Sequence, residues 1–421
     1  MSGFWAARAV VGGRVLEGVA FSADAAGRVD SWRAGVRAPA AALAFGLITP
    51  GFANAHSHAF HRRLRGRTHS LGGDFWRWRE AMYAAAEDLE PDTYHELATG
   101  LFRELAGAGY TAVGEFHYLR HCRDGSPYPS NAMELALAEA ARDAGIRLTL
   151  LDACYLTGGI GQELTGAQRR FGDGDAAGWL DRWGRLRDAL AAPADTFGLV
   201  RLGAAAHSVR AVPPAGLARI AAELPAGVPI HTHLSETPQE NRDCVRAYGL
   251  TPTQVMAEAG LLGPRLAAVH ATHLTPDDIV ALGASGATVV ACPTTEADLG
   301  DGIGPARALA DAGARLAIGS DQQVVIDPFR ELASLEGHQR LALRRRGVFS
   351  PPELWRAGQA DGYRCLGFDP PLELGGPCDF IELDPASPRT AGSQPDQIIF
   401  AAGPADVLRT VVGGRPVGRT P

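Results

Sequence analysis

The chain has 421 residues, of which 46% are hydrophobic and 21% are charged, as is usual for a globular enzyme of one large domain or two ordinary ones. Its net charge of −7 at pH 7 gives no overall attraction to nucleic acid or to an anionic membrane, so an anionic ligand must be bound by local positive charge. All basic residues are arginine, which excludes a Schiff-base lysine and a carboxylated lysine bridging two metal ions.

The cysteines and the N-terminus indicate an intracellular protein. The six cysteines are scattered, without the paired spacing of a disulfide framework or a cysteine zinc site. The N-terminus lacks the basic start and apolar core of a signal peptide, and no apolar run approaches the ~18 residues of a membrane span. We therefore expect a cytoplasmic protein that binds neither membranes nor nucleic acid.

The sequence at both ends of the chain predicts short strands. From Phe4 to about Ala44 these strands are separated by glycine and aspartate, and they are too short to form a core alone. Matching segments follow the turn-rich stretch 372–377, with the sequences CDFIELD, DQIIFA and LRTVVGGRPVG. We expect residues 1–47 and 371–421 to form one small β-sandwich domain.

Residues 48–370 alternate between apolar, β-rich runs and helical patterns. The eight runs are Ile48–Ala55, Thr111–Phe116, Arg147–Tyr155, Gly198–Ala205, Val228–Leu234, Leu266–His270, Ala287–Cys292 and Arg315–Gly319. The helical patterns are Pro91–Ala108, Asn131–Ala144, Pro214–Glu223, Pro252–Ala259, Pro276–Leu282 and Ala306–Ala312. The alternation predicts parallel βα units, and eight of them predict a (β/α)₈ TIM-type barrel with its active site at the carboxyl ends of the strands.

Polar residues gather where these runs end. His56 and His58, in PGFANAHSHAF, are two residues apart and so face the same way on a strand. The other strand-end residues are Glu115, His117, Tyr118, His207, Arg210, His231, His233, Glu236, His270, His273 and Asp321. Three imidazoles and one carboxylate suit a borderline-soft divalent ion, most simply Zn²⁺, with Fe²⁺ or another divalent ion as the alternative.

Each of these residues also has a purely structural interpretation. His231 lies deeper in its strand than His233, and we expect it to be a hydrogen-bonded core residue. Asp321 could cap the segment that follows it, but its position after the eighth strand favours a role at the metal. The remaining histidines have no partner pattern and are expected in packing or at the surface: His69, His95, His121 and His338.

The same residues predict a hydrolytic reaction. A bound ion lowers the pKa of water toward neutrality. His270, together with Asp321, is placed to take up a proton, and Glu236 is placed to pass a proton to a leaving nitrogen. A metal-binding module without catalysis would have a closed four-ligand site, in which Glu236 and His270 would serve no purpose.

Several segments resemble the formimidoylglutamate deiminases of the amidohydrolase superfamily. They are PGFANAHSHAF, DFWRWREAMY, GEFHYL, AHSVRAV, IHTHLSET, HATHL, CPTTEADLGDGI and IGSDQQV, between about Ile48 and Arg346. The resemblance implies a homodimer with one metal ion per chain that hydrolyses N-formimino-L-glutamate to N-formyl-L-glutamate and ammonia in histidine degradation. The alternative is a diverged deaminase of the same superfamily acting on another imine, an amidine or a heterocycle.

The resemblance also implies the residues of the site. The implied metal ligands are His56, His58, His233 and Asp321, the implied catalytic residues are Glu236, His270 and Asp321, and the implied substrate contacts are Arg79, Tyr118, His207 and Arg210. His61 occupies a further substrate-contact position, where the family usually has glutamine, and Asp298 replaces an asparagine. Arginine forks suit the two carboxylates of this substrate. Whether His61 and Asp298 change substrate preference stays open, as does whether the loop Trp76–Met82 serves its own or a neighbouring active site.

Overall fold

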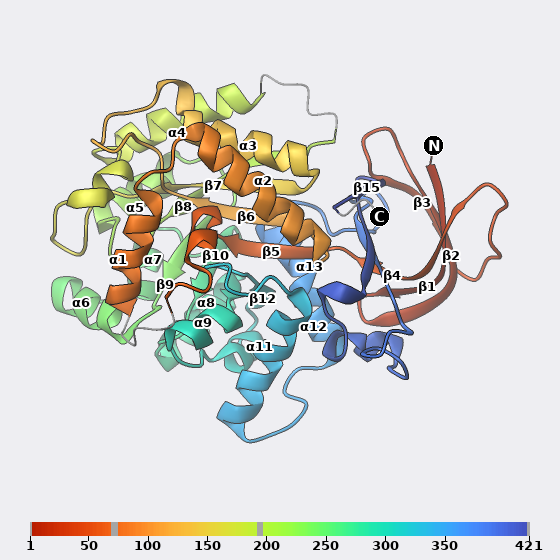
Figure 1. Cartoon of the computed structure of the whole chain (residues 1–421). Helices are drawn as coiled ribbons and strands as arrows, with labels where there is room; N and C mark the ends of the chain where they lie inside the picture. Colours follow the sequence, from red (N-terminus) through yellow and green to blue (C-terminus); the bar gives the residue numbers. More distant parts are fainter. Residues whose placement is uncertain (1, 69–74, 192–196, 419–421) are drawn as a thin grey trace.

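A computed structural model describes residues 2–68, 75–191 and 197–418, which form a barrel and a separate sheet (Figure 1). The eight barrel strands are parallel and follow the chain in spatial order. They are β5 (Phe52–Ser57), β6 (Tyr110–His117), β7 (Arg147–Cys154), β8 (Val200–Ala206), β9 (Ile230–Leu234), β10 (Leu266–His270), β11 (Thr288–Ala291) and β12 (Arg315–Ile318). A parallel bridge between Ser57 and Asp321 brings the end of β5 to the segment after β12. The predicted (β/α)₈ fold is therefore confirmed.

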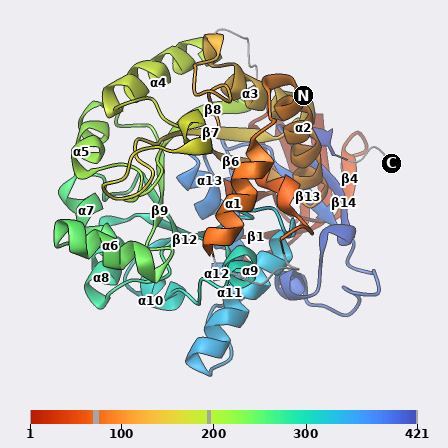
Figure 2. The ribbon, with the colours of Figure 1, turned by 60° about the vertical axis from the view of Figure 1, so that its left-hand side comes forward.

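Helices pack on the barrel, most of them around its outside (Figure 2). They are α1 (Phe75–Ala86), α2 (Pro91–Gly107), α3 (Ala132–Ala144), α4 (Ala176–Ala191), α5 (Pro214–Glu223), α6 (Pro238–Tyr248), α7 (Pro252–Glu258), α8 (Pro276–Ser285), α9 (Pro293–Leu299), α10 (Ala306–Asp311), α11 (Pro328–Leu343), α12 (Pro351–Gly358) and α13 (Ala360–Cys365). Several begin with a hydroxyl residue followed by proline. The hydroxyls of Thr251 and Thr275, for example, accept the backbone N–H groups of Gln254 and Asp278, which fixes where α7 and α8 begin. Within the described part of the chain, no helix is long and apolar enough to cross a bilayer.

Small side chains inside the barrel make room for α13 and the residues after it. Alanines of β5, β6, β10 and β12 pack with Tyr363, Leu366 and Phe368 in one buried cluster. Figure 2 shows α13 inside the ring formed by the outer helices. Because this end of the barrel is filled, open space for a ligand lies at the other end, where the strands finish.

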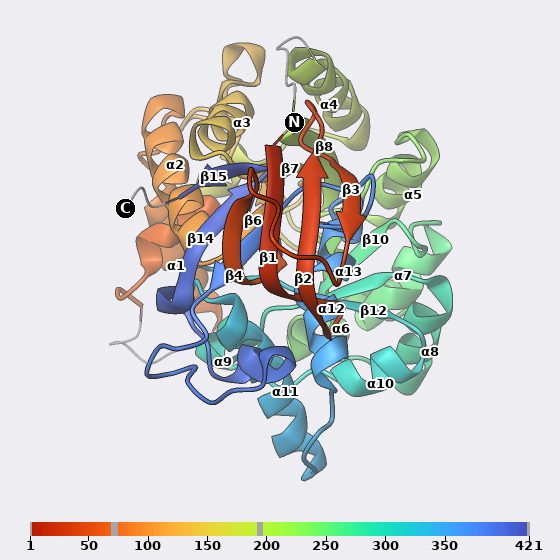
Figure 3. The ribbon, with the colours of Figure 1, turned by 90° about the vertical axis from the view of Figure 1, so that its right-hand side faces the viewer.

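The two ends of the chain meet in a seven-stranded sheet with the order β15-β14-β13-β4-β1-β2-β3 (Figure 3). Its strands are β1 (Ser2–Val11), β2 (Arg14–Ala23), β3 (Val29–Arg33), β4 (Leu43–Pro50), β13 (Phe380–Leu383), β14 (Val407–Val412) and β15 (Arg415–Val417). The rings of Phe4, Phe21 and Phe45 surround Phe380, with centroids 5.0–5.7 Å from it. Aromatic residues from both termini thus share one core, and the two ends of the chain meet as predicted, but their strands form one sheet instead of a sandwich.

Three predicted segments were wrong in detail. The run Ile48–Ala55 is split between β4 and β5, because the chain leaves one sheet for the other at Gly51, where a Cβ atom would collide with Thr111. DQIIFA is not a strand but lies in a 3₁₀ helix, Pro395–Phe400, whose adjacent isoleucines are both buried instead of alternating. The segment Trp76–Met82 belongs to helix α1 and is not a loop.

Candidate metal centre and active site

A cavity of about 420 Å³ opens at the carboxyl ends of the barrel strands. Its lining includes the predicted ligands His58, His233 and Asp321, as well as Glu236 and His270. The volume falls within the range of small-molecule sites. The strand-end histidines and carboxylates therefore face a space that can hold a substrate.

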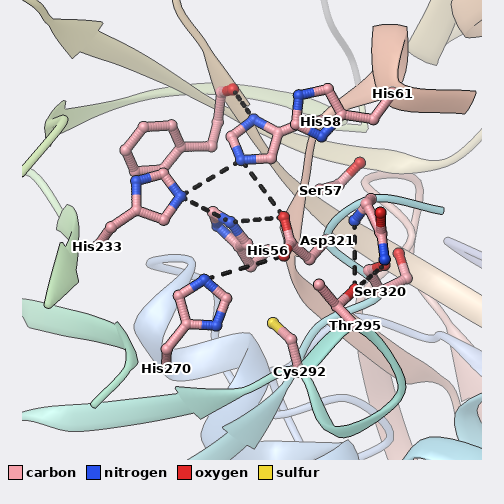
Figure 4. A network of polar contacts seen from close by, with 12 residues as sticks. His56, Ser57, His58, His61, His233, His270, Cys292, Thr295, Ser320 and Asp321 are labelled. Atoms are coloured by element: carbon pink, nitrogen blue, oxygen red, sulfur yellow. Dashed lines mark hydrogen bonds and ion pairs between the residues drawn. The ribbon is translucent and has the colours of Figure 1, made fainter. Parts of the chain in front are cut away.

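Four side chains converge beside this cavity (Figure 4). The Nε2 atom of His233 lies 3.2 Å from Nε2 of His56 and 3.4 Å from Nε2 of His58. Oδ1 of Asp321 lies 3.4 Å from Nε2 of His56 and 3.5 Å from Nε2 of His58. Ligand atoms about 2.1 Å from a tetrahedral ion lie roughly 3.4 Å apart, so these four residues fit a divalent metal.

The ring orientations of two histidines support this fit. Nδ1 of His58 lies 2.8 Å from the carbonyl oxygen of Phe116, and Nδ1 of His233 lies 3.0 Å from that of His207. A carbonyl oxygen can only accept, so Nδ1 carries the proton and the Nε2 lone pair points into the cluster. Burial lowers the pKa of His56 to about 3, which keeps that ring neutral and able to bind a metal.

Asp321 is held by its backbone as well as by its side chain. Its N–H donates to the carbonyl of His56, and its own carbonyl accepts from the N–H of His58. Its φ of 44° lies in the left-handed region that a non-glycine residue rarely adopts. Burial acts to raise the pKa of Asp321, but the contacts with His56, His270 and His58 together outweigh burial and leave that pKa below its ordinary value.

His270 and Glu236 form a second group beside the candidate ligands. Nε2 of His270 lies 3.8 Å from Oε1 of Glu236 and 3.9 Å from Oδ2 of Asp321. Oε2 of Glu236 accepts from Arg210 at 2.6 Å. Burial acts to lower the pKa of His270, but the surrounding carboxylates, Glu296 foremost, raise it to about 10. A proton carrier and a carboxylate held by arginine thus lie within 4 Å of each other.

The five predicted substrate contacts all line the cavity: His61, Arg79, Tyr118, His207 and Arg210. Nε2 of His61 lies 3.2 Å from the hydroxyl of Tyr118. Arg79, on α1, lies over the ring of Tyr83 at 5.7 Å. Positive side chains therefore reach this cavity in a protein whose net charge is negative.

Four other polar residues at strand ends do not line the cavity. Glu115 accepts from the Ser57 hydroxyl at 2.6 Å and from a backbone N–H group. His117 contacts Tyr94 behind β6, Nε2 of His231 contacts the carbonyl of Cys365 at 3.0 Å, and His273 contacts the carbonyl of Asp301. Their bonding partners lie in or just after β5, in α2, in α13 and in a loop, outside the cavity lining, so we interpret them as structural residues.

The histidines outside the strand ends also have local roles. His95 pairs with Asp143, His121 is buried against the carbonyl of Gly172, and His338, on α11, lines a small cavity. His69 lies outside the described residues.

Sequence reasoning missed several residues of the site. Tyr155, Gln162 and Arg246 line the cavity, and Glu296 lies 3.5 Å from Nδ1 of His270. Arg246 lies on α6, a helix that was not predicted because it is strongly polar. Glu296 could have been singled out by its place in the first turn after β11, where buried carboxylates are uncommon.

Known proteins with similar sequences are amidohydrolases and deaminases. The model of the amidohydrolase family matches residues 47–417. The chain is 37% identical to a formimidoylglutamate deiminase of Pseudomonas aeruginosa, over 100% of this chain and 95% of that one. It is 29% identical to a 5-methylthioadenosine/S-adenosylhomocysteine deaminase of Natronomonas pharaonis, over 88% of this chain and 81% of that one.

Among solved structures, a crystal structure of an amidohydrolase from Brucella melitensis superimposes with a TM-score of 0.91 and 32% identity, covering 99% of this chain and 95% of that one. Fold, sequence and the convergence of histidines and carboxylates at the strand ends agree. The chain belongs to the amidohydrolase family and is a hydrolase of carbon–nitrogen bonds.

Proposed function

We propose that this protein hydrolyses N-formimino-L-glutamate to N-formyl-L-glutamate and ammonia. In this reaction the oxygen of one water molecule bonds to the formimino carbon, the bond from that carbon to its terminal nitrogen breaks, and the nitrogen leaves as ammonia with the protons of the water. The observation that carries the proposal is the arrangement of one cavity. It joins a cluster fit for a metal, an acid–base pair and arginine side chains able to bind carboxylates.

In this proposal His56, His58, His233 and Asp321 hold one Zn²⁺ ion per chain. The three imidazoles and one carboxylate are a donor set that would suit zinc, which can expand to five ligands in catalytic sites and so admit water. The ion, when bound, supplies a Lewis acid that lowers the pKa of water. The tautomers of His58 and His233, fixed by carbonyl oxygens, mean that these rings need no reorganisation to bind it.

The proton transfers are assigned to His270, Asp321 and Glu236. A cation held by Asp321 would offset the carboxylates that raise the pKa of His270, so His270, within 4 Å of both Asp321 and Glu236, could then take up a proton from water. Glu236 then carries a proton to the nitrogen that leaves. Arg210 bonds one oxygen of Glu236 and so turns the other oxygen toward His270.

The two carboxylates of the substrate are assigned to Arg79, Tyr118, His207 and Arg210, with His61 beside them. Arg79 reaches the cavity from α1 and Arg210 reaches it from the segment after β8, so they line different parts of the wall. Binding two carboxylates at fixed positions orients the small reacting group between the acid–base residues. Because Arg210 also bonds Glu236, occupation of this subsite would be coupled to the position of the acid–base residue.

A heterocycle deaminase is the alternative, and the aromatic lining favours it. Trp78, Tyr83, Tyr118, Tyr155 and Phe171 all face the cavity and could stack on a ring. The arginines favour the dicarboxylate, because a guanidinium can bind a carboxylate through charged, bidentate hydrogen bonds that a neutral heterocycle does not offer.

The test is ammonia release by protein of measured zinc content from N-formimino-L-glutamate, N-formimino-L-aspartate, N-formyl-L-glutamate and guanine. Efficient release from the first compound alone supports the proposal. Release from guanine, or none from N-formimino-L-glutamate at one zinc per chain, would refute the substrate assignment. Removing zinc with a chelator and restoring it should abolish and then recover the activity.

A further inference from the structure

Glu296, in the segment CPTTEADLGDGI, is a buried carboxylate that the proposed reaction does not use. It lies in the first turn of α9, directly after β11, and its residue is only 6% exposed. Oε1 of Glu296 accepts the backbone N–H of Cys292 at 2.8 Å. The same oxygen lies 3.5 Å from Nδ1 of His270. One carboxylate oxygen therefore faces both the start of its own helix and the back of the His270 ring.

The His270 ring lies between two sets of carboxylates. Its Nε2 faces Glu236 and Asp321 at 3.8 and 3.9 Å, and its Nδ1 faces Glu296 at 3.5 Å. The backbone turns sharply at this residue, with φ values of 68° for His270 and 51° for Ala271. Rotation about the side-chain bonds of His270 would carry Nε2 away from the site, and a partner at Nδ1 opposes that rotation.

We propose that Glu296 is a positioning residue for His270: it accepts the Nδ1 proton and so holds Nε2 toward Glu236 and Asp321. This inference rests on the proposed role of His270 as the proton carrier. An orienting carboxylate behind a catalytic imidazole has a precedent in hydrolases, where it fixes the tautomer of the ring and takes no proton itself.

The competing interpretation is that Glu296 only caps α9 through Cys292. A second carboxylate, Glu331 on α11, also binds the first turn of α9 and so offers a matched control for this role. Glu331 is fully buried, accepts the N–H of Thr294 at 3.1 Å in the first turn of α9, and has no contact with His270 among the described residues. Replacing Glu331 should cost stability as replacing Glu296 does, without changing the His270 ring.

A small space behind the ring allows a second kind of test. A cavity of about 20 Å³ is lined by His270, Glu296, His338 and Gln339, on the side of the ring away from the substrate cavity. The substitution Glu296→Ala would enlarge this cavity by about the volume of a carboxyl group and one methylene group. Formate could then take the place of the lost carboxylate next to Nδ1.

The experiment compares the zinc-loaded wild type with Glu296→Ala, Glu296→Gln and Glu331→Gln. For Glu296→Ala we expect kcat to fall by roughly 10²-fold or more, with KM changed less than about threefold and zinc retained. Formate should restore part of the rate. Glu296→Gln should keep an intermediate rate, because its amide oxygen can still accept the Nδ1 proton, and Glu331→Gln should keep the wild-type kcat even where its melting temperature falls.

Nitrogen-15 NMR of the His270 ring, assigned with His270→Gln, gives a readout independent of turnover. The signal of Nδ1 should change in Glu296→Ala and stay unchanged in Glu331→Gln. An unchanged ring signal, or a kcat in Glu296→Ala equal to that in Glu331→Gln and insensitive to formate, would overturn the proposal. If the wild type does not act on N-formimino-L-glutamate, the substrate assignment fails, while the NMR comparison still decides the role of Glu296.

Discussion

The substitution Glu236→Gln separates the proposed chemistry from metal binding. Glutamine has the size of glutamate but cannot carry a proton between His270, 3.8 Å away, and a leaving nitrogen. General acid–base catalysis contributes typically 10²–10⁴-fold, so kcat should fall by about that factor, or roughly 3–5 kcal/mol at 1.36 kcal/mol per tenfold. The zinc content should not change. Among the described residues, Glu236 does not belong to any group of side chains whose ligand atoms lie close enough together to hold one ion.

The stability of this variant should fall only moderately. Arg210 loses a charged partner at 2.6 Å but keeps Glu240 at 3.6 Å, and the new amide oxygen can still accept its hydrogen bond. A loss of about 1–3 kcal/mol is expected for a charged hydrogen bond weakened in this way.

The assay is ammonia release with zinc measured on the same samples, beside Glu240→Gln as the matched control. Glu240 is also a carboxylate partner of Arg210 but has no contact with His270 among the described residues, so its variant should lose less than about tenfold in kcat. A kcat for Glu236→Gln within tenfold of wild type would refute the acid–base role. Loss of zinc from this variant would instead make Glu236 a ligand.

Three further predictions concern the cavity wall, pH and the passage between the two sheets. Arg79→Met should raise KM for N-formimino-L-glutamate by tenfold or more with little change in kcat, because a charged hydrogen bond is worth about 1.5–3 kcal/mol; an unchanged KM would remove Arg79 from the subsite. Burial raises the pKa of Glu115 from 4.5 to about 8, so the folded protein holds this proton more tightly than the unfolded chain, and the stabilisation is full below pH 4.5 and lost as pH rises toward 8. Glu115→Gln mimics the protonated group, so urea unfolding should show the variant gaining stability relative to wild type between pH 5 and 8; a constant difference would contradict the prediction. Gly51→Ala should destabilise the protein by several kcal/mol, because its Cβ would lie 2.0 Å from Oγ1 of Thr111, whereas Gly46→Ala, whose Cβ has its nearest neighbour at 3.5 Å, serves as the control in the same denaturation assay.

The barrel could be predicted because its local signals are strong. Each buried parallel strand appears as a continuous apolar run, and many helices begin with proline after a capping residue, so β10 and α5 have the bounds that the sequence predicted. Helices with weak or polar patterns, such as α4 and α6, were not predicted. The passage from β4 to β5 was also missed, because an apolar run does not show that a chain changes sheets.

The topology of the barrel explains why the sequence could predict which residues meet in the candidate site. In a parallel barrel all strands end at the same face, so residues far apart in sequence, such as His56 and Asp321, are brought together once the strands are assigned. Side-chain partners do not follow from this rule. The sequence placed Arg210 at the substrate and Glu236 at the reaction, but their mutual bond of 2.6 Å depends on how the segments after β8 and β9 pack.

That bond gives Arg210 two possible tasks that the same experiment can separate. If Arg210 mainly binds a substrate carboxylate, Arg210→Met should raise KM and leave the rate on saturating substrate nearly intact. If it mainly holds Glu236 in place, kcat should fall with KM little changed, because the substitution frees Glu236 to turn away from His270. The structure favours a mixed result in which both parameters change, since Arg210 lines the cavity and bonds Glu236 at once. A variant with wild-type values of both would exclude Arg210 from binding and from catalysis.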